Sequence, residues 1–309
     1  MLLIAAGAWG ICIPIMKVLS TEQHFLAPET GTISAAAASL AVRFGFAMIT
    51  VTLISRISPR SISKKEWWNG FVLGMLTAIS MWIQIDGINY TSASTAGFLI
   101  AMYSIFIPLF TWISGRRKMT LPLAICCLLV IGGMGTLTGF NLHTFSLGRG
   151  EWESLIAAVL FSCQILWVDR LTPGWVDPER LTWVLCSTVS LFCLIALSFF
   201  PGGLSNLGDL HASARAIYLT AFLSILGTAV PFLIMNRFQS RVSPVAAGFI
   251  YCFEPITTAV GALFLPALLV RAGGGYDNEN FTLRLILGGS LVLAANLVLL
   301  ADRPVKTKS

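Results

Sequence analysis

The stretch NYTSASTAGFLIAMYSIFIP, residues 89–108, has a counterpart in SRVSPVAAGFIYCFEP, residues 240–255. Ala96-Gly97-Phe98 aligns with Ala247-Gly248-Phe249, and each stretch ends in a proline. Each is followed by an apolar run that contains a pair of adjacent glycines. A repeat of this kind predicts that the chain consists of two similar halves. The expected halves are residues 1–147 and 148–309, which together form one integral membrane domain.

Apolar runs recur along the whole chain, of which 56% is hydrophobic and 11% charged. Each run has about the 17 to 25 residues that a helix needs to cross the hydrocarbon core of a membrane. The runs are continuously apolar, which favours helices over a transmembrane barrel with its alternating strands. The sequence therefore predicts an all-α polytopic membrane protein with ten transmembrane helices, at about 1–20, 33–56, 67–89, 93–114, 119–140, 151–171, 181–200, 212–236, 243–265 and 282–301.

Ten helices divide into two sets of five, and an odd number of helices makes the second set cross the membrane in the opposite direction. Two inverted five-helix repeats are typical of secondary transporters, whose substrate site lies near the membrane midplane beside helices broken by Gly or Pro. Pro108 and Pro255 are the predicted helix breaks, because proline removes a backbone donor and restricts the residue before it.

Lys and Arg residues are concentrated in alternate loops, including Arg56, Arg60, Lys64 and Lys65 after the second run. Basic loops remain on the cytoplasmic side, so both termini are predicted to be cytoplasmic. The first run is expected to be a retained helix of a multi-pass cell-membrane protein, in a bacterium the inner membrane, and not a signal peptide. Because the loop bias accounts for the net charge of +6, the charge does not indicate nucleic-acid binding.

Four stretches together resemble the EamA-type transporters of the drug/metabolite transporter superfamily. They are AWGICIPIMK (8–17), VRFGFA (42–47), residues 82–109 and residues 242–264. The resemblance implies ten helices in two inverted halves around a central cavity, and export of amino acids, other metabolites or drugs. The chain departs from the family where relatives carry a Gly-Glu pair at the ends of the fourth and ninth helices. It has SGRRKMT and the longer LPALLVRAGGGYDNENFT there, so the role of that glutamate does not transfer.

Four ionisable residues, Lys17, Arg43, Asp86 and Glu254, lie within or at the edges of the runs. Inserting such a group costs at least about 2.5 to 3.5 kcal/mol, so each is expected to face a cavity or a partner. Glu254 lies near mid-membrane, and its counterpart before Pro108 is the apolar Ile107. Glu254 is therefore a candidate substrate or proton site, with a structural ion pair or a hydrogen bond that fixes helix packing as the alternative.

The other three charges leave alternatives open. Arg43 lies near the middle of its run, where it either pairs with Glu254 or Asp86 or grips a substrate carboxylate. Lys17 is near the outer end of its run and either extends to the interface or contacts substrate. Asp86 also lies near the outer end of its run, where it is either a gate residue or a solvated helix terminus.

Further residues within the predicted spans complete the expected lining of a pocket, which combines apolar walls with a few polar groups. These are Trp9, Gln84, Tyr103, Asn236 and Tyr251.

Cofactors are not predicted. All seven cysteines fall inside the apolar runs, where they are expected to pack as free thiols. Neither a nucleotide-binding GxxxxGK[ST] loop nor a metal-ligand spacing occurs in the sequence.

The predicted function is a secondary transporter, an exporter of small metabolites, amino acids or drugs by alternating access, with proton coupling as an open possibility. Its partners would be a small-molecule substrate, the lipid bilayer and protons, and the oligomeric state is not predicted. Two alternatives from other classes are a membrane-embedded lipid-modifying enzyme and a non-transporting scaffold or receptor. The enzyme would need a clustered nucleophile, base or metal site, and the acids of this chain are scattered.

Overall fold

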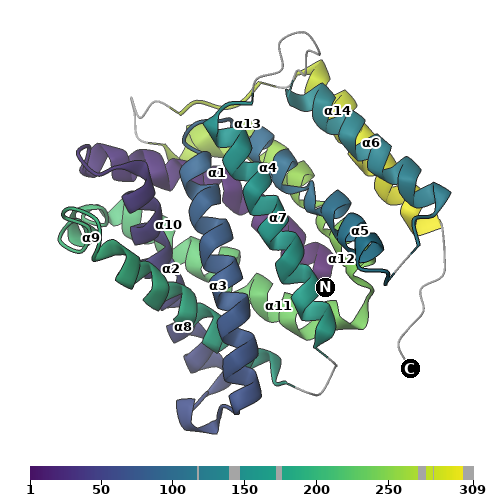
Figure 1. Ribbon diagram of the computed structural model, residues 1–309. Helices are drawn as coiled ribbons and strands as arrows, with labels where there is room; N and C mark the ends of the chain where they lie inside the picture. The colour runs from purple at the N-terminus through teal and green to yellow at the C-terminus, as the bar shows by residue number, and fades with distance from the viewer. Residues whose placement is uncertain (117, 139–146, 172–175, 271–275, 281, 302–309) are drawn as a thin grey trace.

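The structure of the protein is a computed structural model, which describes residues 1–116, 118–138, 147–171, 176–270, 276–280 and 282–301. Within these ranges every regular element is a helix (Figure 1), as the all-α prediction requires. The elements are α1 (Leu2–Leu26), α2 (Thr32–Ser55), α3 (Lys64–Gly87), α4 (Ala93–Ile100), α5 (Tyr103–Ile113), α6 (Leu121–Thr138), α7 (Arg149–Arg170), α8 (Pro178–Leu197), α9 (Asn206–Asp209), α10 (Ala214–Ser224), α11 (Val230–Phe238), α12 (Pro244–Tyr251), α13 (Glu254–Leu269) and α14 (Leu283–Ala301).

Eight helical segments of the described chain are long and apolar enough to cross a membrane. Three of them combine shorter elements: α4 with α5, α10 with α11, and α12 with α13. The apolar parts of α6 and α14, Leu121–Gly133 and Leu283–Ala295, are shorter. The chain is therefore a multi-pass membrane protein, in which eight of the ten predicted spans meet the length that a crossing requires. The end of the predicted span 119–140 lies outside the described residues.

Short polar side chains fix where many of these helices begin. Ser63 accepts a hydrogen bond from the backbone of Glu66, whose carboxylate accepts one in return from the backbone of Ser63, so that α3 starts with a capping box. Asp177 caps α8 through the amides of Glu179 and Arg180. Single serines precede and cap α4, α10 and α12, namely Ser92, Ser213 and Ser243.

Two spans are broken at matching places in the repeat. The first break falls at Ala101 and Met102, between α4 and α5, and the second at Cys252 and Phe253, between α12 and α13. Along the sequence, the first break follows Ala96 by as many residues as the second break follows Ala247. The prediction that Pro108 breaks its helix is wrong, because Pro108 lies inside α5.

Pro255, in contrast, stands in the first turn of α13 beside its break. A backbone N–H has no helical partner in a first turn, so proline costs little there. Tyr103 begins α5 as Glu254 begins α13, so the positional counterpart of Glu254 is Tyr103 and not Ile107.

Helices within residues 1–147 pack against helices within residues 148–309. The principal neighbours are α2 with α8, α3 with α7 and α8, α1 with α13, and α6 with α14. The α6–α14 pair lies to one side of the other helices (Figure 1). Glycines permit the closest approaches: a Cβ on Gly70 or Gly74 of α3 would come within 3 Å of Val184 or Thr188 of α8.

Gly10 of α1 makes the tightest of these approaches. A Cβ at this position would lie 2.0 Å from the Thr257 hydroxyl and 2.2 Å from the Glu254 carbonyl oxygen, whereas one on Gly7 would be 3.7 Å from the Phe253 ring. We expect Gly10→Ala to force α1 away from α13 and to lower the melting temperature in detergent by several degrees, which corresponds to about 1–3 kcal/mol of overpacking. Gly7→Ala is the matched control and should leave the melting temperature unchanged. Equal melting temperatures for the two variants would show that α1 and α13 are not in such close contact.

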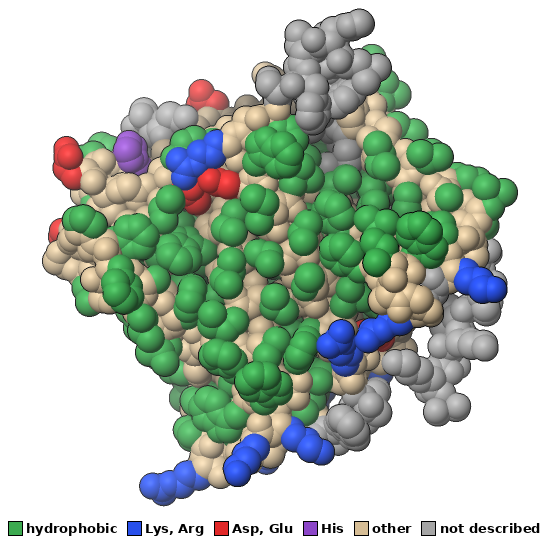
Figure 2. Space-filling view, in the orientation of Figure 1, with side chains coloured by type: hydrophobic (Ala, Val, Ile, Leu, Met, Phe, Trp, Pro, Cys, Tyr) green, Lys and Arg blue, Asp and Glu red, His purple; other side chains and the backbone are tan. Residues whose placement is uncertain are grey.

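The surface agrees with a membrane setting. Figure 2 shows hydrophobic side chains over the middle of one face, Lys and Arg side chains toward its lower end, and most of the Asp and Glu at its upper end. Arg60, Lys64 and Lys65 lie at the end of the molecule where α2 stops and α3 starts. We call this end the basic end.

Candidate functional site

A cavity lies between the helices of the two halves and encloses about 590 Å³ of empty space, including the part that is open to solvent. Side chains from α1 to α5 and from α7, α11, α12 and α13 contribute to its wall. Most of them are apolar, as is usual for a pocket that binds a small molecule. Six of the predicted site residues line it: Trp9, Arg43, Gln84, Tyr103, Tyr251 and Glu254.

Arg43 brings a buried positive charge to this wall, and only 2% of its surface is exposed. Its guanidinium donates to the Thr228 hydroxyl at 2.6 Å, to the Gly227 carbonyl at 2.9 Å and to the Met16 sulfur at 2.9 Å. Gly227 and Thr228 belong to a π-helical segment, Ile225–Ala229, that links α10 to α11. Such local bulges are frequent at functional sites.

The predicted ion pair of Arg43 is absent from the described part of the chain. No carboxylate there lies within 4.0 Å of the guanidinium: Asp86 pairs with Arg149 instead, and Glu254 bonds to a tyrosine. Neutral acceptors hold Arg43 in place but leave its charge uncompensated. An anionic group of a bound molecule could therefore compensate it.

Glu254 brings a carboxylate to the same cavity from the first residue of α13. It is 8% exposed, and the Tyr103 hydroxyl donates to its Oε2 at 3.3 Å. Tyr103 is the first residue of α5, so the two residues that restart the broken helices contact each other across the cavity. The N-terminus of a helix favours a negative charge, which helps to accommodate the carboxylate at this position.

Aromatic rings form another part of the wall. Trp9 makes edge-to-face contacts with Phe232 and Tyr251, both at 5.5 Å between ring centres, and Tyr251 meets Tyr103 at 6.5 Å. The Tyr251 hydroxyl donates to Gln239, whose amide donates to the carbonyl of Ile165 on α7. These bonds join α12 to α7 on the side of the cavity toward the basic end.

Gln164 of α7 also lines the cavity and is a polar residue that the sequence reasoning missed. It is 3% exposed, its Nε2 approaches only the Met235 sulfur at 4.0 Å, and its Oε1 has no hydrogen-bond partner among the described residues. A lone amide within an apolar run was the available signal. The oxygen is free to accept a hydrogen bond from a molecule in the cavity.

Three predicted site residues lie elsewhere. Asn236 donates to the Thr182 hydroxyl between α11 and α8. Lys17 donates to the Thr91 carbonyl and lies 5.0 Å from the centre of the Tyr276 ring. Burial, together with the Glu279 carboxylate, raises the pKa of Tyr276 above its usual value.

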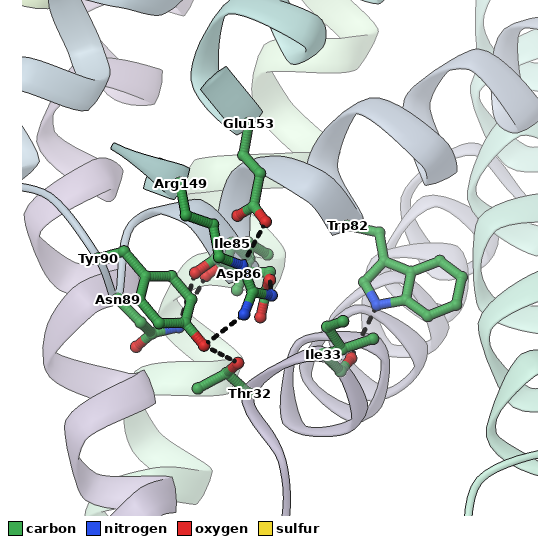
Figure 3. Close-up of polar contacts among 9 residues, drawn as sticks. All are labelled: Thr32, Ile33, Trp82, Ile85, Asp86, Asn89, Tyr90, Arg149 and Glu153. Atoms are coloured by element: carbon green, nitrogen blue, oxygen red, sulfur yellow. Dashed lines mark hydrogen bonds and ion pairs between the residues drawn. The ribbon is translucent and has the colours of Figure 1, made fainter. Parts of the chain in front are cut away.

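Asp86, the third of these residues, belongs to an ion cluster at the end of the molecule opposite the basic end (Figure 3). Arg149 of α7 pairs with Asp86 and, at 2.7 Å, with Glu153, and it also donates to the Tyr90 hydroxyl at 2.9 Å. The expectation of a solvated helix terminus at Asp86 is wrong, because Asp86 is buried and connects α3 to α7.

The sequence also predicts that the cysteines pack as free thiols, and it contains no metal-ligand spacing. All seven cysteines fall in the described residues, and none forms a disulfide. Within those residues no group of three His, Cys, Asp or Glu side chains is placed to hold a metal ion. The chemistry that this site offers is binding, because a cation, a carboxylate and two amides share an otherwise mostly apolar wall.

Comparison with known proteins finds one family that is similar to the first part of the chain. The EamA-like transporter family matches residues 1–139, which confirms the resemblance seen in the sequence over that part of the chain. One solved structure, titled "Crystal structure of protein", is similar over 96% of this chain and 98% of its own, with a TM-score of 0.62 and 15% identity. That likeness concerns the fold alone. No curated protein matches the chain.

Proposed function

We propose that the protein is a secondary transporter that exports a small molecule by alternating access. The observation that carries this proposal is the cavity between the halves, into which Arg43 and Glu254 bring opposite charges. Small metabolites, amino acids and drugs are the substrate classes in view. A substrate with an anionic group would bind at Arg43, and one with an amine at Glu254.

Alternating access requires two parts that move against each other, and we assign these parts to residues 1–147 and 148–309. Helix contacts support an inverted relation between them. In an inverted repeat of these parts, α1 corresponds to α7, α3 to α11 and α5 to α13. The α1–α13 contact then corresponds to the α7–α5 contact, and the α3–α7 contact corresponds to the α11–α1 contact. The pairs α2–α8 and α6–α14 would lie on the two-fold axis. In this proposal α6 and α14 complete ten spans, and both termini lie in the cytoplasm.

Proton coupling through Glu254 is part of the same proposal. Glu254 forms no ion pair with any described residue, and a buried carboxylate of this kind can take up a proton from one side and release it to the other. The match to a transporter family favours transport over a lipid-modifying enzyme and over a scaffold or receptor.

Counterflow into proteoliposomes tests the proposal. Vesicles that contain the purified protein are loaded with one unlabelled metabolite at a time, and entry of the same labelled metabolite is followed. We expect at least one compound to enter faster than into protein-free vesicles. Binding without any flux, measured for the same compounds, would support the receptor alternative instead.

A further inference from the structure

A second hollow opens on the outside of the helix bundle, separate from the central cavity. It lies among the start of α1, the end of α11, α12 and α14, and its empty space measures about 1350 Å³, including the part open to solvent. Apolar side chains such as Leu3, Ile250, Phe253 and Leu293 line it. Among the described lining residues Arg241 has the only charged side chain. We call this hollow the Arg241 groove.

Arg241 carries a positive charge that no carboxylate of the described chain pairs with. Its guanidinium lies 5.1 Å from the centre of the ring of Phe238, which also lines the groove, and Arg241 is exposed. Arg241 is at the basic end, because Arg237 on the preceding turn pairs with Glu179 at the start of α8. Arg241 therefore lies at the level where lipid headgroups meet a membrane protein.

The groove extends from this level toward the middle of the membrane. Its wall follows α12, whose 8 residues cover roughly 12 Å, as far as Phe253 at the helix break. One leaflet of the hydrocarbon core is roughly 15 Å thick. Leu3, Phe253 and Leu293 are 54%, 39% and 42% exposed, so the wall presents apolar surface along its length.

We propose that the Arg241 groove binds one phospholipid of the leaflet at the basic end. An acyl chain lies along α12 between α1 and α14, and the headgroup phosphate contacts Arg241. A basic side chain at the headgroup level above an apolar groove of leaflet depth matches the charge and the shape of this molecule. An anionic headgroup adds to the attraction.

This site goes beyond the proposed transport and does not depend on it. The two sites nevertheless share walls. Phe253 in the groove directly precedes Glu254 in the cavity, and α1 carries Leu3 to the groove and Trp9 to the cavity. A bound acyl chain therefore contacts the helix break that positions Glu254.

Photolabelling tests the site directly. The purified full chain is placed in nanodiscs of phosphatidylcholine that contain a small fraction of phosphatidylglycerol with a diazirine in its acyl chain, and the labelled peptides are mapped after illumination. We expect label to concentrate on the peptides that contain Leu3 and Ile250. Arg241→Gln should reduce this labelling about fivefold, the loss of one basic residue near an anionic headgroup. Arg60→Gln, which removes an exposed arginine away from the groove, should not change it.

Two results would overturn the assignment. One is label spread evenly over the lipid-facing helices of the wild type. The other is equal labelling of the groove peptides in wild type and Arg241→Gln. Ile250→Trp provides a second check on the chain path, because a larger side chain in the groove should reduce labelling even with Arg241 intact, and undiminished labelling would contradict that path.

Discussion

Replacing Arg43 with glutamine is expected to lower the counterflow rate of the identified substrate about ten- to a hundredfold. The guanidinium lines the cavity and is 2% exposed, and the hydrogen-bond acceptors that hold it are neutral among the residues that the structure describes. A substrate anion would make charge-assisted hydrogen bonds with it, each worth about 1.5–3 kcal/mol, and one such bond accounts for a change of this size.

Arg43→Lys separates the charge from the geometry of this side chain. Lysine keeps the positive charge but lacks the planar fork, so we expect an intermediate rate. The melting temperature in detergent has to accompany each rate, because Arg43 also connects α2 to the π-helical segment through Gly227 and Thr228. Wild-type counterflow in a stable Arg43→Gln protein would exclude substrate binding by Arg43.

Replacing Glu254 with glutamine is expected to abolish the response of transport to a pH gradient. Glutamine keeps the size and a hydrogen-bond acceptor for Tyr103 but cannot carry a proton. Exchange of labelled for unlabelled substrate should continue without a gradient, unless the carboxylate also holds a substrate amine. Uptake into proteoliposomes with and without an imposed pH gradient measures both effects.

Tyr103→Phe is the matched control for Glu254→Gln. It removes the hydroxyl that donates to Glu254 at 3.3 Å and leaves the carboxylate in place. Transport by this variant should still respond to the gradient. Full gradient-driven uptake by Glu254→Gln would show that the proton moves by another route.

Much of the fold was predictable, because a bilayer sets a long and continuous apolar signal for each helix. The broken helices were predictable only in part. Proline marks the second break, where Pro255 stands in the first turn of α13, but the first break has no proline: it falls at Ala101 and Met102. Pro108 is instead accommodated inside α5. Treating proline as the mark of a helix break therefore placed the first break at Pro108 instead of at Ala101 and Met102.

The site was predictable in its residue types and less so in its arrangement. Charges such as Arg43 and Glu254 stand out in apolar runs because burying them is costly. Which of them share a cavity depends on how each helix is rotated, and this is set by packing between the halves. Lys17 and Asp86 carried the same signal in the sequence, yet they bond to Thr91 and Arg149 outside the cavity. Gln164 is uncharged and therefore stands out less in an apolar run, yet it lines the cavity.

The central claim is that the charges lining the cavity act on the transported molecule, while those outside it support the structure. Counterflow of one substrate by four variants tests this most directly: Arg43→Gln, Glu254→Gln, Lys17→Gln and Asp86→Asn, each normalised to the amount of folded protein in the vesicles. The cavity account predicts that the Arg43 variant loses most of its counterflow, that the Glu254 variant loses its response to a pH gradient, and that the Lys17 and Asp86 variants keep both. Two results together would contradict this expectation. They are a loss of counterflow in the Lys17 and Asp86 variants, and wild-type counterflow and pH-gradient response in the Arg43 and Glu254 variants.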